Sequence, residues 1–249
     1  MLRKTFLHIP GIGEKTEQKI WSNEIYTWND FLNLKHTLNM GSSKLQRIED
    51  YVKRSIQSHK ENDYQFLLSN FPNNIHWRSY NDLRDKCCFL DIETTGLDSK
   101  RNDLTVIGLY DGIESKFFIR GKNLGEFRDE IQKYDLVVTF NGKRFDVPFI
   151  QEKFANLDFN MFHIDLMYEL KKLGYSGGLK KIEKNLGIKR AENVDEVDGR
   201  EAVRLWKKYM KGNDNALDTL IDYNREDIVN LKEIMEFTYD KLRDKRFSY

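Results

Sequence analysis

Residues 89–97 read Phe-Leu-Asp-Ile-Glu-Thr-Thr-Gly-Leu, and this run decides the fold that we expect for the chain. It continues an apolar segment that begins at 87 and leads directly into two acids, Asp91 and Glu93. Residues two apart in a β-strand point to the same face of the sheet. The pair therefore projects two carboxylates side by side from a buried strand. Such close like charges are costly unless a cation holds them, and hard divalent ions take oxygen ligands. A solvated strand end that carries two acids by chance is the alternative.

Around this run the chain has the pattern of a mixed α/β domain. Short apolar and β-branched segments predict four strands, at 87–93, 104–110, 116–119 and 136–140. Short turns join the first three, which predicts an antiparallel meander. A helix at about 124–134 precedes the fourth strand, so that connection is a crossover. Helices dominate from residue 147 onward, and the last one runs from about 216 to 241.

The front of the chain has a helical pattern instead, and we expect a separate domain there, at 1–75, followed by a second at 76–249. A polar stretch at 69–74 is the candidate linker between them. Pro10-Gly11-Ile12-Gly13 predicts a tight turn that opens directly onto a helix. Backbone N–H groups at such a helix start bind phosphate without reading bases. Thr27 is the expected N-cap of a following short helix.

Composition limits the class of protein. Of the 249 residues, 39% are hydrophobic and 33% are charged, yet the formal net charge is only +1. This balance excludes a polybasic tail but not a nucleic-acid partner. No apolar run has membrane-spanning length and no signal-peptide core follows the N-terminus, so we expect a cytoplasmic protein with no membrane partner. The two cysteines, Cys87 and Cys88, are strand neighbours that point to opposite faces, which predicts buried thiols and no disulfide.

Two further acids, Asp146 and Asp227, stand where a site is expected. Asp146 follows the fourth predicted strand, and sites gather at strand ends in α/β sheets. A helix N-cap ahead of Val147 is a compatible alternative role. Asp227 lies in the apolar stripe of the last helix, where a charge is expensive unless it is compensated. Tyr223 lies one turn earlier, so its hydroxyl and the Asp227 carboxylate project together. A solvent-exposed acid is the alternative for Asp227.

Taken in order, three segments resemble the exonuclease motifs of the DEDD 3′–5′ exonucleases of the ribonuclease-H-like superfamily. They are Asp-Ile-Glu-Thr-Thr-Gly-Leu at 91–97, Val-Thr-Phe-Asn-Gly-Lys-Arg-Phe-Asp at 138–146, and Tyr223-x-x-x-Asp227, which includes the string Asn-Arg-Glu-Asp at 224–227. The tyrosine resembles the tyrosine subclass, and the strings resemble its YprB-like branch. The resemblance covers about residues 84 to 240. It implies an α/β ribonuclease-H-like fold with a mixed sheet, its first three strands antiparallel, flanked by helices, beside a small N-terminal all-α domain.

The resemblance also implies an activity, metal-dependent 3′–5′ hydrolysis of phosphodiester bonds in single-stranded DNA or at DNA ends. Four acids would hold two divalent ions, Mg²⁺ or Mn²⁺, about 4 Å apart. These acids are Asp91, Glu93, Asp146 and Asp227. Asp91 would bridge both ions, Glu93 and Asp227 would complete the site of the attacking water, and Asp146 would support the second ion. Tyr223 would orient the nucleophile, because a tyrosine pKa of about 10 suits a general base poorly.

Further residues are candidate contacts for nucleic acid. By resemblance, Thr94 and Thr95 contact the terminal nucleotide and Leu97 packs against its base. The loop of the second motif adds Asn141, Lys143 and Arg144, of which the two cations reach a phosphate or are solvated loop charges. Basic residues also recur on one predicted helix, as a binding face or an ordinary charged surface, at Arg200, Arg204, Lys207, Lys208 and Lys211.

The N-terminal turn resembles the hairpin of a helix-hairpin-helix motif, which binds the DNA backbone without reading sequence. Gly11 and Gly13 would then contact nucleic acid, and the first domain would anchor the substrate. Glu14 and Glu17 depart from that pattern and weaken the attraction for phosphate, so packing alone is the competing explanation.

Two alternative functions remain open. One is the same chemistry applied to RNA, as a 3′-end trimming exonuclease. The other is a catalytically silent nucleic-acid-binding module on the same fold, which the intact set of acids disfavours. Near the site, Asp165 is interpreted as the N-cap of the helix that begins at Leu166, and His163 as a packed histidine.

Overall fold

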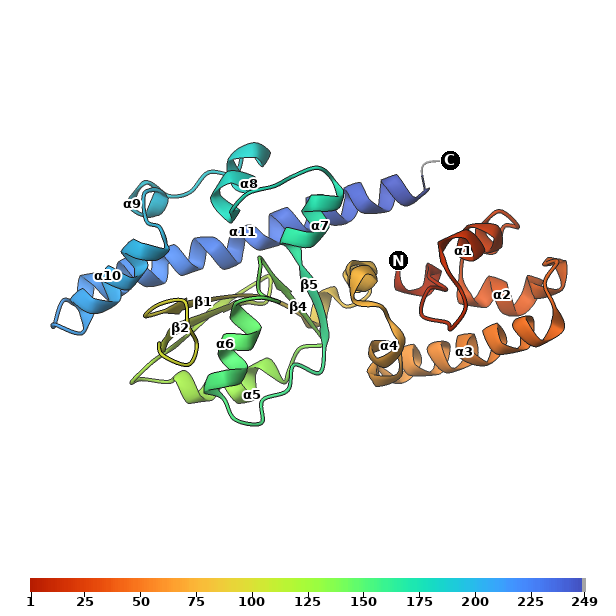
Figure 1. Cartoon of the computed structure of the whole chain (residues 1–249), viewed down its shortest axis with the longest axis horizontal. Coiled ribbons are helices and arrows are strands. Elements are labelled where there is room, and N and C mark those ends of the chain that lie inside the picture. The colour runs from red at the N-terminus through yellow and green to blue at the C-terminus, as the bar shows by residue number, and fades with distance from the viewer. Residues whose placement is uncertain (248–249) are drawn as a thin grey trace. The chain divides into compact units, whose positions relative to one another are not determined.

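A computed structural model describes residues 1–247 of the chain. The chain forms two compact units, Met1–Leu83 and Arg84–Tyr249 (Figure 1). The carboxylates of the three predicted motifs all belong to the second unit. Within the described residues, no helix combines the length and the apolar character that a bilayer crossing requires.

Every regular element that the structure shows in the first unit is a helix, with η denoting a 3₁₀ helix. These are η1 (Leu2–Lys4), α1 (Glu14–Trp21), α2 (Trp28–Leu34), η2 (Lys35–Thr37), α3 (Ser42–Glu61), α4 (Gln65–Asn70) and η3 (Asn73–Ser79). As predicted, Thr27 caps α2, and it forms a capping box with Asp30. The polar stretch at 69–74 lies inside this unit, because Phe71 within it is buried. The structural division therefore comes later in the chain than the predicted boundary after residue 75.

A buried ion pair changes the interpretation of Glu17. Its carboxylate is fully buried and accepts a hydrogen bond from the Arg78 guanidinium at 2.9 Å. The same oxygen accepts from the Thr5 hydroxyl and the Phe6 backbone N–H, both at 2.8 Å. The expected repulsion of phosphate by Glu17 is therefore wrong, because this charge faces the interior and Arg78 compensates it.

The predicted turn at 10–13 is present directly before α1. Gly11 has a φ of +77°, a conformation that strains other residues, and both Gly11 and Gly13 are exposed. Gly13 is the N-cap of α1, and a Cβ added there would meet nothing within 4 Å. Within residues 1–247, the three-residue η1 is the sole helix before this turn, so a full first helix of a helix-hairpin-helix motif is missing from the described chain.

The second unit is built on a five-stranded mixed sheet (Figure 1). Its strands are β1 (Cys87–Thr94), β2 (Leu104–Tyr110), β3 (Ser115–Ile119), β4 (Leu136–Thr139) and β5 (Phe162–Asp165). Their order is β3-β2-β1-β4-β5, with the first three antiparallel and with β4 and β5 parallel to β1. The predicted meander and crossover are confirmed. The short β5 has no counterpart among the predicted strands, because half of its four residues are His and Asp.

Helices cover both faces of this sheet (Figure 1). They are η4 (Arg84–Lys86), η5 (Leu124–Glu126), α5 (Phe127–Ile131), α6 (Asp146–Lys153), α7 (Leu166–Lys172), α8 (Leu179–Leu186), α9 (Glu192–Asp195), α10 (Gly199–Tyr209) and α11 (Asp214–Phe247). One core packs α5 and α6 on the sheet through Leu90, Phe127 and Phe149. The other packs α10 and α11 on the sheet through residues such as Val106 and Leu220. The long last helix is confirmed and extends beyond its predicted ends.

The close approach of α11 to the sheet depends on Gly108 of β2. Gly108 pairs with Asp91 in the β1–β2 ladder. A Cβ built on Gly108 would lie 1.8 Å from the Asn224 side-chain oxygen and 3.2 Å from Ile228 Cδ1. Any larger residue would therefore displace the Asn224 side chain or the helix that carries it. The missing side chain lets the helix that carries Asp227 lie within reach of the acids on β1.

Candidate metal centre and active site

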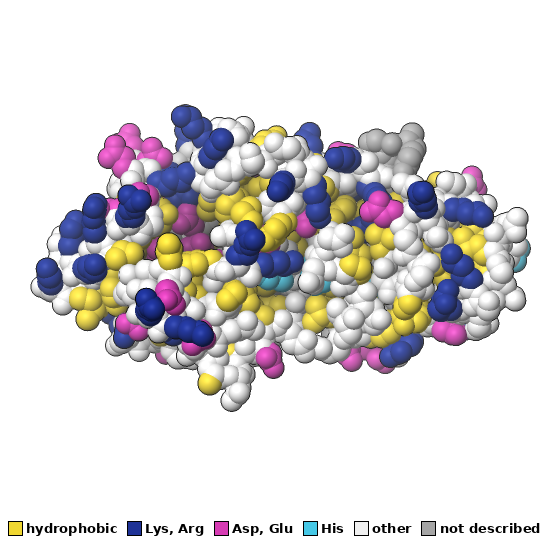
Figure 2. Space-filling model, in the orientation of Figure 1, with side chains coloured by type: hydrophobic (Ala, Val, Ile, Leu, Met, Phe, Trp, Pro, Cys, Tyr) yellow, Lys and Arg dark blue, Asp and Glu magenta, His cyan; other side chains and the backbone are white. Residues whose placement is uncertain are grey.

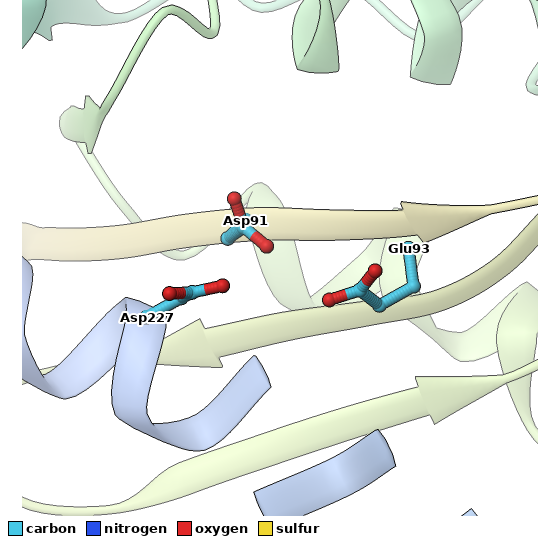
Figure 3. Close-up of side chains that lie close together, drawn as sticks. All are labelled: Asp91, Glu93 and Asp227. Atoms are coloured by element: carbon cyan, nitrogen blue, oxygen red, sulfur yellow. The ribbon is translucent and has the colours of Figure 1, made fainter. Parts of the chain in front are cut away.

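Three carboxylates from two elements meet at the surface of the sheet (Figure 3). Asp91 and Glu93 project from one face of β1, and Asp227 reaches them from α11. One oxygen of each residue lies within 4.8 Å of the other two. Glu93 and Asp227 are buried, and Asp91 is half-buried. Convergent carboxylate oxygens are the donor set that Mg²⁺ and Mn²⁺ prefer, so these residues fit a divalent metal.

Burial raises the pKa of every acid in this cluster, and repulsion by Asp227 adds to the shift at Asp91 and Glu93. Burial raises the pKa of Asp91 well above its usual range, and the charge of Asp227 raises it further. The same two causes raise the pKa of Glu93. Burial raises the pKa of Asp227 to about 6, against the opposing influence of Arg190. Because metal binding requires ionised ligands, a bound cation would release protons from this cluster.

Asp146 lies beside the three acids and outside their group. Its side chain is buried, and its Oδ1 accepts a hydrogen bond of 3.2 Å from the backbone N–H of Ile92. Because Ile92 stands between Asp91 and Glu93, this bond joins α6 to the strand of the site. Burial raises the pKa of Asp146 to about 7, although backbone N–H groups oppose the shift. Phe145 occupies the N-cap position of α6, so the alternative role of Asp146 as that cap is wrong.

Asn224 is a site residue that the three motifs do not single out. Its Nδ2 donates to Asp91 at 2.9 Å and to Glu93 at 3.5 Å, and the side chain is fully buried. Through these two bonds it links the two β1 acids to α11. The available signal in the sequence is its position three residues before Asp227, which places both side chains on one face of α11.

Tyr223 also faces the site. Its ring centre lies 5.5 Å from the Arg190 guanidinium carbon and 5.7 Å from the Lys180 ammonium. Burial raises the pKa of the Tyr223 hydroxyl, and the charges of Asp227 and Glu93 add to the shift. The hydroxyl therefore stays protonated at neutral pH and can donate a hydrogen bond, which is the property that an orienting residue needs.

Arg190, which lies outside the three motifs, also acts on the acids. Its side chain is 2% exposed and donates two hydrogen bonds of 2.7 Å to Glu183 and a third to Asp227. Asn230 completes the network by donating to Glu183 at 2.9 Å. Burial alone would lower the pKa of Arg190, but Glu183 and Asp227 more than offset this and raise it. A permanent positive charge therefore borders the carboxylate cluster.

Residues 88–239 match the family model described as the RNase_H superfamily. The chain belongs to the RNase_H superfamily. The matched residues include all five strands of the mixed sheet of the second unit, apart from the first residue of β1. A comparison with curated proteins found no match.

A comparison with solved structures found chains that are similar to this one. The family B DNA polymerase from the hyperthermophilic archaeon Pyrobaculum calidifontis is similar with a TM-score of 0.50 at 15% identity, over 60% of this chain and 24% of the polymerase chain. Brucella melitensis NrnC is similar with a TM-score of 0.46 at 18% identity, over 68% of this chain and 80% of NrnC. A structure of Brucella melitensis NrnC bound to pGG gives a TM-score of 0.42 at 18% identity, over 68% of this chain and 79% of the NrnC chain.

Two hollows open onto the acids of this RNase_H-superfamily site and share Asp91, Tyr223 and Asp227 in their linings. The larger one has a volume of about 590 Å³ and lies between the end of β1, the loop after it and α10. It is lined by two of the predicted nucleotide contacts, Thr94 and Leu97, and the Leu97 side chain is 86% exposed. The smaller one, of about 440 Å³, lies beside the start of α8. Both volumes suit ligands of nucleotide size.

The other predicted contacts of the second unit line neither hollow. They are Thr95, Asn141, Lys143 and Arg144. The backbone N–H groups of Asn141 and Lys143 donate to Asp165 at 2.8 and 3.1 Å, which fixes the loop of the second motif. Asp165 also caps α7, as predicted. The Thr95 hydroxyl accepts the N–H of Asp103 at 2.8 Å and so helps to close the loop after β1.

Proposed function

We propose that the second unit is a metal-dependent 3′–5′ exonuclease that hydrolyses phosphodiester bonds of single-stranded DNA or DNA ends with two divalent ions. The observation that carries the proposal is the convergence of Asp91, Glu93 and Asp227, each with an oxygen within 4.8 Å of the others, beside a hollow of nucleotide size. Divalent ions in such a site acidify the attacking water and stabilise the leaving oxygen. Membership of the RNase_H superfamily supports nuclease chemistry over other metal-dependent hydrolysis.

The side chains of the site have different roles in this proposal. Asp91, Glu93 and Asp227 bind the cations directly, and Asp146 supports them from its position beside the cluster. Tyr223, which stays protonated, donates a hydrogen bond that orients the attacking water. Because the folded protein holds these groups in place before substrate arrives, little reorganisation is needed during the reaction.

The larger hollow is the proposed place of the terminal nucleotide. Leu97 exposes a large apolar side chain within the lining that also holds the acids, and Phe145 and Thr94 lie in the same lining. An unstacked base covers such apolar surface favourably, whereas a base inside a duplex cannot reach it. This arrangement favours a single-stranded end as the substrate.

The first unit is proposed to bind the nucleic-acid backbone through the turn at 10–13. Gly11 and Gly13 are exposed there, and Gly13 begins α1 with open space around it. Backbone contacts of this kind hold a strand without selecting its sequence.

Oligonucleotides of DNA and of RNA, labelled at each end in turn and incubated with Mg²⁺, Mn²⁺ or EDTA, test the activity. We expect a ladder of DNA products shortened from the 3′ end, and no shortening in EDTA. Shortening of RNA alone would establish the trimming alternative instead. Binding of either polymer without metal-dependent shortening would support the alternative function, a catalytically silent nucleic-acid-binding module.

A matched pair of variants on α11 tests the metal assignment. Asp227→Asn removes a carboxylate oxygen from the cluster, and Asp218→Asn makes the same change at an exposed position of the same helix. We expect Asp227→Asn to lose more than about 100-fold in cleavage rate, because a direct ligand matters at least as much as its supporting shell. Asp218→Asn should keep full activity. Equal activity of the two variants would refute the assignment.

A further inference from the structure

One wall of the larger hollow is basic. Helix α10 contributes Arg200, Arg204 and Lys207 to its lining, at spacings of four and three residues that place them on one face of the helix. We call these three residues the basic face of α10. All three are exposed, and the catalytic acids line the same hollow. Figure 2 shows Lys and Arg side chains gathered at the end of the molecule where Figure 1 places α10.

The charges of the basic face are available to a ligand. Arg200 and Lys207 form no ion pair with another residue of the described chain, and Arg204 has an exposed pair with Glu201 at 3.1 Å, which is a weak interaction in water. The helix N-terminus itself is already satisfied, because Asp198 accepts the N–H groups of Arg200 and Glu201 at 2.9 Å. Side chains, and not the helix end, therefore offer the attraction.

The opposite side of α10 fixes the orientation of the basic face. Ala202, Leu205 and Trp206 are buried in the core that α10 shares with α11 and the sheet. The helix cannot rotate without exposing these side chains to water. The three cations are thus held toward the hollow by the packing of the helix, although their long side chains keep their own freedom.

We propose that the basic face of α10 binds the sugar-phosphate backbone of the strand whose end lies at the acids. This inference rests on the proposed function and names the part of the site that attracts the substrate. The acidic cluster repels a polyanion, and cations in the same hollow offset that repulsion. Arg200 and Arg204 match phosphate geometry, and Lys207 adds a point charge. Such contacts read neither base nor sugar, so DNA and RNA gain from them alike.

Salt-dependent binding tests the proposal directly. Arg200→Gln, Arg204→Gln and Lys207→Gln are combined in one protein, and Lys208→Gln with Lys211→Gln is the control, because neither Lys208 nor Lys211 lines the hollow. Fluorescence anisotropy with a labelled single strand of about 12 nucleotides is read in EDTA over a range of salt concentrations. We expect the triple variant to bind at least about 10-fold more weakly at low salt, and its slope of log affinity against log salt to shrink by about 0.7 for each lost phosphate contact. An unchanged slope, or an equal change in the control, would overturn the proposal.

Kinetics of the same proteins separate binding from chemistry. The triple variant should raise KM for the 12-nucleotide strand, and it should leave kcat for that strand and the turnover of a dinucleotide unchanged. An equal loss of kcat on both substrates, with a normal thermal melt, would show that the basic face acts on the reaction and would contradict the proposal. If no protein cleaves any substrate, the proposed function fails while the anisotropy result still decides this inference.

Discussion

Asp227 and Asp146 hold their protons to unusually high pH when no cation is bound. Burial raises their pKa values to about 6 and about 7, above the unfolded value of about 4. Between these limits the folded protein binds more protons than the unfolded chain, so the contribution of these two groups to the free energy of unfolding decreases as pH rises. Below about pH 4 both states are protonated, and that contribution is complete.

A bound cation competes with these protons, which gives a prediction. The increase in Tm caused by Mn²⁺ should be larger at about pH 7.5 than at about pH 5.5, since the ligands are ionised at the higher pH without metal having to displace protons. Thermal melts with Mn²⁺ and with EDTA at both pH values measure it. An Mn²⁺ effect that is as large at the lower pH as at the higher would contradict the raised pKa values.

The Arg190 side chain is also expected to contribute strongly to the free energy of unfolding. Arg190→Met leaves the buried Glu183 without its bidentate partner, and such an uncompensated charge costs about 3–5 kcal/mol. Lys189→Met removes an exposed cation from the neighbouring position and should change the free energy of unfolding by less than about 0.5 kcal/mol. Urea unfolding in EDTA compares them. Adding Glu183→Gln to Arg190→Met should recover part of the loss, and a further loss would argue against the pair.

At the scale of elements, the approach of α11 to β2 depends on one absent side chain. In Gly108→Ala the new Cβ would overlap the Asn224 side chain, so that side chain or α11 has to move and the protein should lose about 1–3 kcal/mol. Gly125→Ala is the control, because a Cβ there meets nothing within 4 Å. The Mn²⁺-induced rise in Tm should weaken in Gly108→Ala alone. Combining Gly108→Ala with Asn224→Ala removes the overlap, so a double variant no more stable than Gly108→Ala would exclude this steric cause.

Local spacing explains which parts of the site were predictable. Asp91 and Glu93 share a face because they are two apart in a strand, and the position of Asp227 in an apolar stripe indicates a buried acid. These rules need only a few neighbouring residues. The spacing of Asn224 from Asp227 places both on one face of the last helix but does not show what Asn224 contacts, and Arg190 has no local signal, since the contacts of both residues depend on how closely separate elements approach in the folded chain.

In the fold, too, features that depend on neighbouring residues were predictable and features that depend on contacts between distant segments were not. The meander of β1, β2 and β3 follows from short connections, and the long last helix from its apolar stripe. The strand β5 is too short and too polar to have a sequence signal of its own, and its pairing with β4 supplies its structure. In the first unit, the burial of Glu17 depends on Arg78, which lies far away in the sequence.

At the scale of the whole molecule, the first unit is proposed to add affinity for nucleic acid. Gly13 and Gly41 are both N-caps with no atom within 4 Å of an added Cβ, which makes them a matched pair. If the turn at 10–13 contacts phosphate, Gly13→Glu should weaken binding of single-stranded DNA by about 3- to 10-fold, in line with loss of one or two backbone contacts. Gly41→Glu should not, and kcat should be unchanged in both. If anisotropy gives the two variants equal affinities, the turn has only a structural role in the first unit.

The guanidinium of Arg190 lies against the carboxylates as a cation that the chain supplies for itself. We therefore expect the fold to persist in a chelator, unlike the fold of small zinc domains. Under the proposed function, a shortage of the ion would then stop cleavage and leave the folded protein intact.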